Sequence, residues 1–213
     1  MLIENLIKKF NPNQATKILD LPCGEGRHAL QLNQLGFDVT GADLSERSIQ
    51  FAKQFETETL KFFVHDIRKP FAENQFDWVL NLFTSFGYFS SEKENQNAMQ
   101  TLSNALKPGG LLIIDFLNDT VVRKGLPAES SIEMEGVKFQ ISKSLNEKFV
   151  VKEIEVNSNG KIEHFVEQVQ LLSLSDFEKL FSDFGLNLIQ TFGDYQLNPF
   201  TDKSERLILV ARK

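Results

Sequence analysis

Short apolar runs and segments of helical periodicity alternate along the chain from residue 17 to residue 116. A run of consecutive apolar residues predicts a buried strand, whereas apolar residues three and four positions apart predict a helix with one buried face. The predicted strands lie near residues 18–21, 37–43, 62–67, 76–81 and 111–114, and the predicted crossover helices at 27–36, 45–55 and 91–106. This order predicts an α/β fold with a parallel sheet and right-handed crossovers.

Capping signals set the predicted ends of the helices. Apolar residues at helical spacing over 2–10 predict an N-terminal helix before the first strand. Ser45 is the expected cap of one crossover helix, and residues 91–94 form a capping box for another. The Lys-Pro-Gly-Gly segment at 107–110 is expected to stop that last helix.

The pattern changes after the fifth predicted strand. Two extended runs, 148–156 and 161–171, are joined by an Asn-Ser-Asn-Gly turn signal. We therefore expect an antiparallel hairpin or small sheet within residues 120–172, inserted as a lid or a dimerisation element.

The remaining chain predicts one more helix and two strands. Ser175 and the three residues after it are the expected start of the helix, and Gly185 is its expected stop. Residues 186–192 and 206–211 read as the two closing strands.

Composition narrows the class of protein. A length of 213 residues is ordinary for one α/β domain, so we expect a single domain over 1–213. A net charge of -6, without a lysine-rich stripe, argues against a nucleic-acid partner. No apolar run approaches the ~20 residues that span a bilayer, and the N-terminus lacks a secretory pattern, so we expect no membrane partner and a cytoplasmic location. With Cys23 the only cysteine and three scattered histidines, we expect no disulfide and no metal site.

The stretch from residue 18 to residue 43 carries the most informative chemistry. A buried strand leads into a turn with Gly24 and Gly26, then a helix, then a strand that ends at Asp43. Glycines let the backbone turn sharply and approach a ligand closely, and free N–H groups near Arg27 open the helix. A carboxylate such as Asp43 suits the two hydroxyl groups of a ribose. The stretch is typical of a nucleoside-cofactor site.

Two classes of cofactor fit this geometry. Residues 24–29 match the dinucleotide pattern G-x-G-x-x-[GA], with Asp43 near the distance expected for the ribose acid. Asp20, however, stands just before the glycines, where a carboxylate would repel a pyrophosphate and attract an amino group or a sulfonium. The sign of this charge favours S-adenosylmethionine over NAD.

Residues 19–28, Leu-Asp-Leu-Pro-Cys-Gly-Glu-Gly-Arg-His, resemble motif I of the class I S-adenosylmethionine-dependent methyltransferases. Residues 62–67, 76–81 and 107–114 are similar to the later strands of that family. The resemblance implies a Rossmann-like, doubly wound, mostly parallel seven-stranded sheet with an antiparallel last strand.

The resemblance also implies roles for individual residues. Asp43 is expected to hold the ribose, and Asp66 with Ile67 to hold the adenine. Asp20 and Gly24 are expected near the aminocarboxypropyl arm. The full set of expected cofactor-binding residues is Asp20, Cys23, Gly24, Gly26, Arg27, Asp43, Leu44, Asp66, Ile67, Asn81, Leu82 and Phe83.

The aromatic stretch after the fourth predicted strand, residues 81–89, is expected to line the reacting channel. It begins with Asn81 but lacks the two prolines of family members that methylate adenine or glutamine nitrogens, which disfavours those substrates. The candidate general bases are Tyr88 in this stretch, His164 on the insert and Tyr195 in the loop after the sixth strand.

We therefore expect an enzyme that transfers a methyl group from S-adenosylmethionine to an N, O or C atom of a small molecule by in-line displacement. Two alternatives stay open at this point. One is a protein that binds the cofactor without turnover, as a sensor or partner subunit, and the other is an NAD-dependent oxidoreductase. Free strand edges on the insert also lead us to expect a homodimer.

Overall fold

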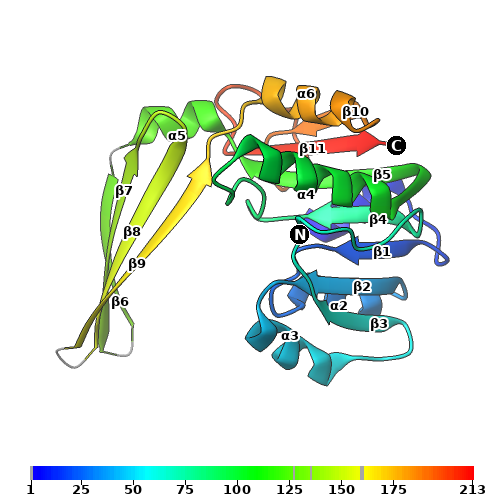
Figure 1. The fold of residues 1–213 in the computed structure, drawn as a ribbon, viewed down its shortest axis with the longest axis horizontal. Coiled ribbons are helices and arrows are strands. Elements are labelled where there is room, and N and C mark those ends of the chain that lie inside the picture. Colours follow the sequence, from blue (N-terminus) through cyan, green and yellow to red (C-terminus); the bar gives the residue numbers. More distant parts are fainter. Residues whose placement is uncertain (1, 127, 135, 159–160) are drawn as a thin grey trace.

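The computed structural model describes residues 2–126, 128–134, 136–158 and 161–213. Within these residues a seven-stranded sheet has the order β10-β11-β5-β4-β1-β2-β3 (Figure 1). Its strands are β1 (Lys17–Asp20), β2 (Asp38–Asp43), β3 (Leu60–Val64), β4 (Phe76–Asn81), β5 (Leu106–Leu117), β10 (Asn187–Phe192) and β11 (Arg206–Arg212). The neighbouring pairs from β5 to β3 are parallel, and β11 runs antiparallel to both β5 and β10. The predicted α/β fold is confirmed.

Helices cover both faces of this sheet (Figure 1). One face carries α1 (Leu2–Phe10), α2 (Arg27–Gln34), α3 (Glu46–Ala52) and the short η1 (Lys53–Phe55), and the other carries α4 (Glu92–Ala105) and α6 (Leu174–Asp183). Successive strand residues point to opposite layers, so Ile18 packs with the first group of helices and Leu19 with the second. Burial on both faces explains why these strands read as continuous apolar runs.

The predicted N-terminal caps are confirmed for two helices, and the predicted cap of a third helix is wrong. Ser45 accepts a hydrogen bond from the Ser48 N–H at the start of α3, and Ser91 accepts one from the Glu94 N–H at the start of α4. The cap of α6 is Ser173, in a capping box with Asp176, and the predicted cap at Ser175 is wrong.

Two further segments differ from the prediction. α4 ends at Ala105, before the Lys-Pro-Gly-Gly segment as predicted, but that segment already lies inside β5, which begins at Leu106 and not at the predicted residue 111. It is held there because the N–H of Gly109 donates to the carbonyl of Lys213 and the N–H of Lys213 donates to the carbonyl of Gly110. A short helix that the sequence did not indicate, α5 (Asp119–Gly125), follows β5.

The insert is a four-stranded antiparallel sheet in the described residues, ordered β6-β7-β8-β9. Its strands are β6 (Ala128–Met134), β7 (Val137–Leu145), β8 (Phe149–Ser158) and β9 (Lys161–Gln170). The two predicted runs correspond to β8 and β9, while β6 and β7 were not predicted as strands. Part of the predicted turn, residues 159–160, lies outside the described residues.

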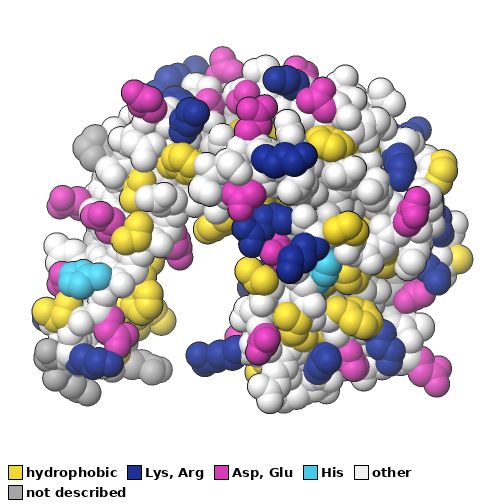
Figure 2. Space-filling model, viewed as in Figure 1, with side chains coloured by type: hydrophobic (Ala, Val, Ile, Leu, Met, Phe, Trp, Pro, Cys, Tyr) yellow, Lys and Arg dark blue, Asp and Glu magenta, His cyan; other side chains and the backbone are white. Residues whose placement is uncertain are grey.

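The insert projects from the main sheet like the arm of an arch, and the molecule is hollowed between the two (Figures 1 and 2). Its base is tied to the main body where the N–H of Gln170 donates to the carbonyl of Gly87, 2.8 Å away. Among the described residues, we find no helix with the length and apolar character needed to cross a membrane.

Candidate functional site

A cleft of about 480 Å³ lies at the carboxyl ends of β1, β2, β3 and β4. Open α/β sheets bind their ligands at this edge. Six of the residues expected to contact cofactor or substrate line it, namely Asp43, Leu44, Asp66, Ile67, Phe83 and Tyr88. The other lining residues are Leu21, Pro22, His65, Arg68, Thr84, Ser85 and Phe89.

The two glycines of the turn serve different purposes. Both have positive φ, +55° at Gly24 and +79° at Gly26, a region that favours glycine. A Cβ at Gly24 would meet nothing within 4 Å, so open space lies over this residue. A Cβ at Gly26 would lie 2.5 Å from the Phe62 ring. Packing against Phe62 therefore explains Gly26, and only Gly24 retains the expected role of close approach to a ligand.

Asp43 organises the turn from the end of β2. Its Oδ2 accepts a hydrogen bond from the Gly24 N–H at 2.7 Å, and its Oδ1 accepts one from the Ser45 N–H at 2.9 Å. Each carboxylate oxygen keeps a lone pair for a further donor. Asp43 therefore fixes the turn and still presents acceptors to the cleft.

Asp20 lies beneath the turn rather than in the cleft. Its side chain is 2% exposed, and its Oδ2 has no hydrogen-bond partner among the described residues. Burial, with the nearby Asp43 charge, raises the pKa of Asp20 from 3.8 to about 7, against a smaller opposing effect of the Ala29 N–H. The negative charge argued from the sequence is thus partly neutralised at neutral pH, and Asp43, which is half-buried, is the carboxylate of the turn that lines the cleft.

Cys23 and Arg27 flank the turn without lining the cleft. The Cys23 thiol is 8% exposed, and burial raises its pKa well above the usual value. Cys23 packs in the core under α1 to α3. The Arg27 guanidinium lies 6.0 Å from the centre of the Phe83 ring, within reach of a cation–π contact.

Arg68, which sequence reasoning missed, engages Asp66 in the cleft. Its guanidinium Nε and terminal nitrogen donate to the two oxygens of Asp66 at 2.9 and 2.8 Å, and its other terminal nitrogen donates to Glu94 at 2.6 Å. The hydrogen bonds from Arg68 lower the pKa of Asp66 to about 2. Asp66 is therefore a fixed carboxylate at neutral pH, in the position expected for an acceptor of the adenine amino group.

The turn after β4 has a strained backbone. Phe83 and the β-branched Thr84 have φ values of 59° and 61°, a region that non-glycine residues rarely occupy. Asp115, at the end of the apolar run in β5, holds the turn in place. Its Oδ2 accepts from the Phe83 N–H at 3.0 Å, and its carbonyl accepts from the Thr84 N–H at 2.8 Å.

Asp115 also joins two more side chains to this turn. The Arg206 Nε donates to Asp115 Oδ1 at 2.8 Å, and another Arg206 nitrogen donates to the Thr84 hydroxyl at 2.7 Å. The Tyr195 hydroxyl donates to Asp115 Oδ2 at 3.2 Å. Burial and the Asp115 charge raise the pKa of Tyr195 to about 12, so this phenol is held protonated. The structure thus gives Tyr195 the surroundings of a positioning residue.

Phe83 is the exposed aromatic residue of the turn after β4. The residue is 42% exposed, and its ring stacks on the His28 ring at 4.7 Å and meets the Tyr195 ring edge-on at 5.7 Å. Asn81 and Leu82, also expected at the cofactor, are buried behind it. The Asn81 amide donates to the Leu21 carbonyl at 2.9 Å, so it ties β4 to the end of β1.

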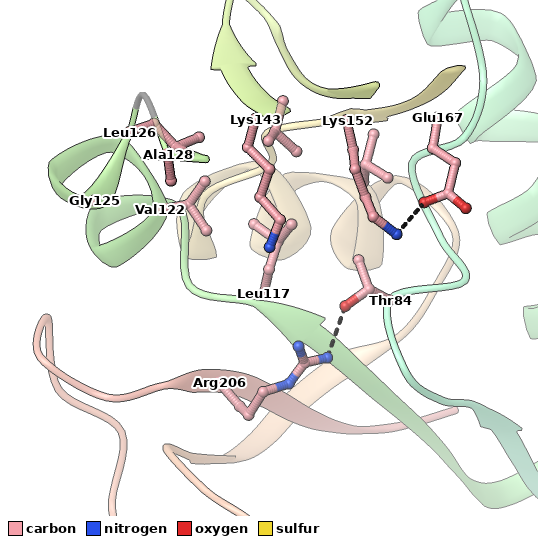
Figure 3. Close-up of a pocket in the computed structure, with 12 residues that line it drawn as sticks. Thr84, Leu117, Val122, Gly125, Leu126, Ala128, Lys143, Lys152, Glu167 and Arg206 are labelled. Atoms are coloured by element: carbon pink, nitrogen blue, oxygen red, sulfur yellow. Dashed lines mark hydrogen bonds and ion pairs between the residues drawn. The ribbon is translucent and has the colours of Figure 1, made fainter. Parts of the chain in front are cut away.

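A second cavity, of about 520 Å³, adjoins the cleft at Thr84, which lines both. Figure 3 shows Lys143 and Lys152 reaching into it from the insert and Arg206 reaching in from β11. Its lining residues are Thr84, Leu117, Val122, Gly125, Leu126, Ala128, Lys143, Val150, Lys152, Glu167, Val169 and Arg206. The cleft and this cavity together give room for two ligands side by side.

The other two candidate bases differ in their placement. Tyr88 lines the cleft, and burial with the charge of Glu167 raises its pKa. His164 lies on β9 three residues from Glu167, so its side chain points to the opposite face of the insert from the cavity, where it approaches Glu155 at 4.0 Å. The structure therefore brings Tyr88 to the cleft, and His164 to neither the cleft nor the second cavity.

The residues of the cleft fit S-adenosylmethionine by their chemistry. Asp43 and Asp66 offer carboxylate acceptors at the two expected strand ends, with the apolar Leu44 and Ile67 beside them. Open space over Gly24 admits a ligand to the turn. Below the turn, the buried Oδ2 atom of Asp20 has no hydrogen-bond partner among the described residues.

Comparisons with known proteins point in the same direction. Residues 18–110 match the family model of a methyltransferase domain. The chain is 26% identical to YqeM of Bacillus subtilis (strain 168), a protein named as a methyltransferase, over 92% of this chain and 84% of YqeM. It is 25% identical to the glycine/sarcosine N-methyltransferase of Aphanothece halophytica, over 99% of this chain and 81% of that protein.

A solved structure shares the fold. The S-adenosylmethionine-dependent methyltransferase of Clostridium acetobutylicum ATCC 824 superposes with a TM-score of 0.86 at 19% identity, over 99% of this chain and 90% of that one. The motif around the glycine turn, the order of the strands in the sheet and the similar proteins all point to the same family. In its glycine-turn motif, its fold and its sequence, the chain is therefore similar to the class I S-adenosylmethionine-dependent methyltransferases.

Proposed function

We propose that this protein is an S-adenosylmethionine-dependent methyltransferase that acts on an N, O or C nucleophile of a small molecule, with the donor in the cleft and the acceptor in the adjoining cavity. The observation that carries the proposal is the single residue Thr84, which lines both spaces. A cavity of about 520 Å³ suits a small molecule, because ligand pockets for such molecules span roughly 300–1,000 Å³. The name of the Aphanothece relative, a glycine/sarcosine N-methyltransferase, supports a nitrogen nucleophile.

The donor-side roles follow from the lining of the cleft. Asp43 would hold the ribose hydroxyls, while Asp66 and the backbone of Ile67 would hold the adenine. Because Arg68 donates to both oxygens of Asp66, the adenine amino group would share this carboxylate with the Arg68 guanidinium. Gly24 lets the aminocarboxypropyl arm approach the turn.

The protein has little bond-making chemistry to supply. When bound, S-adenosylmethionine provides a methyl group already activated by its sulfonium. The residues at the junction need to align the acceptor and exclude water, which is the work of Phe83 and Thr84 on their fixed turn. Glu167 is the carboxylate near the junction that could take a proton from the acceptor. The raised pKa of Tyr88 keeps its phenol protonated at neutral pH, and the roles of Tyr88 and His164 as bases stay predictions from the sequence.

Calorimetric titration of S-adenosylmethionine and of NADH tests the donor. We expect saturable binding of the former and none of the latter, and the reverse result would overturn the proposal. Single-turnover release of S-adenosylhomocysteine with fractionated small-molecule extracts then tests the acceptor. Binding without turnover across broad fractions would instead support a non-catalytic binder.

A further inference from the structure

One cross-strand row of the insert faces the second cavity. Ala128 pairs with Lys143, Lys143 with Lys152, and Lys152 with Glu167, so these four residues stand side by side across β6 to β9. All four line the cavity. The row therefore presents two ammonium groups and one carboxylate to the space between the insert and the main sheet (Figure 3).

The charges of this row do not balance. Lys152 pairs with Glu167 at 3.1 Å. Lys143 has no hydrogen bond or ion pair with any of the described residues, and it stands directly opposite the like-charged Lys152. Like charges directly opposite each other destabilise a sheet, so the fold alone does not favour Lys143 at this position.

The rest of the cavity offers Lys143 no counter-charge. The guanidinium of Arg206 is paired with Asp115, whose side chain is fully buried. The remaining lining is largely apolar, with Leu117, Val122 and Val150 among its members. The cavity thus carries one unmatched positive charge over an apolar surface, in a chain whose formal net charge is -6.

We propose that the acceptor substrate carries an anionic group, a carboxylate or a phosphate, on a partly apolar body, and that Lys143 binds this group. The inference rests on the proposed function, because it assigns the second cavity to the acceptor. Lys143 reaches in from the insert, whereas Thr84 and Arg206 lie on the main-sheet side (Figure 3). The anionic end of the acceptor therefore lies toward the insert, and its nucleophile lies toward Thr84 and the donor cleft.

Simple amphiphiles test this assignment. Hexanoate and hexyl phosphate carry the two kinds of anionic group on an apolar chain, and hexanol is their neutral counterpart. We expect each anion to bind at least tenfold more tightly than hexanol in ligand-observed NMR titrations, with S-adenosylhomocysteine saturating. A preference between the two anions identifies the group. Equal binding of hexanol and both anions would overturn the proposal.

Variants of one strand supply the control. Lys143→Met is expected to weaken binding of the preferred anion at least tenfold and to leave hexanol unchanged, while Lys143→Arg retains the anion. Lys138 lies five residues away on β7, so it faces the other side of the insert, and its side chain is 69% exposed. Lys138→Met should leave anion binding unchanged. Unaltered anion binding in Lys143→Met would also refute the assignment.

A separate titration distinguishes failure of this inference from failure of the proposed function. Affinity for S-adenosylmethionine, measured by calorimetry, should be the same in the wild type, Lys143→Met and Lys138→Met. Normal cofactor binding without anion selectivity overturns the inference alone. Absence of cofactor binding in the wild type overturns the proposed function.

Discussion

The buried carboxyl of Asp20 makes a quantitative prediction for Asp20→Asn. Asparagine is neutral at every pH and has nearly the shape of a protonated carboxyl group. The pKa of Asp20 is about 7 in the folded chain against 3.8 for the free group, because burial and the Asp43 charge disfavour ionisation. Between these two values the folded state holds a proton that the unfolded state has lost, so the wild type loses stability as pH rises.

The size of the effect follows from the width of this window. The shift from 3.8 to about 7 spans roughly three pH units, and each unit corresponds to about 1.4 kcal/mol. The stability of Asp20→Asn relative to wild type is therefore expected to grow from near zero at pH 4 to a limit on the order of 4 kcal/mol at pH 7, and to stay level above it.

Urea unfolding between pH 4 and pH 8 measures this difference. The only tryptophan, Trp78, is 6% exposed in the folded chain and reports unfolding by its fluorescence. Asp202→Asn, at an exposed position in the loop before β11, removes the same formal charge and should give a difference that does not vary in this way. Parallel stability curves for wild type and Asp20→Asn across the whole range would refute the reasoning.

Four other substitutions probe the glycine turn and the turn after β4. A Cβ at Gly26 would lie 2.5 Å from the Phe62 ring, so Gly26→Ala is expected to cost about 1–3 kcal/mol of stability in urea unfolding, while Gly24→Ala costs less. Equal losses in the two variants would contradict the packing role. Asp43→Ala is expected to weaken S-adenosylmethionine binding by ~1–3 kcal/mol in calorimetry, since hydroxyl donors lose their acceptor, and unchanged affinity would remove Asp43 from the site. Asp115→Ala leaves a partly buried guanidinium unpaired and is expected to cost about 3 kcal/mol of stability, so an unchanged urea midpoint would contradict its supporting role.

The sequence predicted the strands and helices of the main sheet well because these elements depend on local signals. Buried strands such as the one at Ile18 read as apolar runs, and the caps at Ser45 and Ser91 mark helix starts. The cap of α6 was missed because two capping boxes overlap there. Both Ser173 with Asp176 and Ser175 with Glu178 have the required spacing, and the sequence does not rank them.

The site was harder to predict because tertiary contacts assemble it. Asp115 interrupts an apolar strand, which was a usable signal, but its partner Arg206 lies 91 residues along the chain. The register of four strands brings Lys143 opposite Lys152, and β7 itself was not predicted. The motif identified Asp20 as a residue of the turn. Its burial and its raised pKa could not be predicted, because they depend on how the side chain packs under the turn.

The division of the two cavities has a consequence for how this protein can change its acceptor. Every residue in the charged row comes from the insert, whereas the carboxylates of the donor cleft come from the main sheet. On the proposed assignment of donor and acceptor, substitutions confined to a few insert strands would retarget the protein to a different small molecule and leave the residues around the methyl donor unchanged. A new acceptor specificity could thus evolve through changes in the insert alone, without changes in the residues that bind the methyl donor.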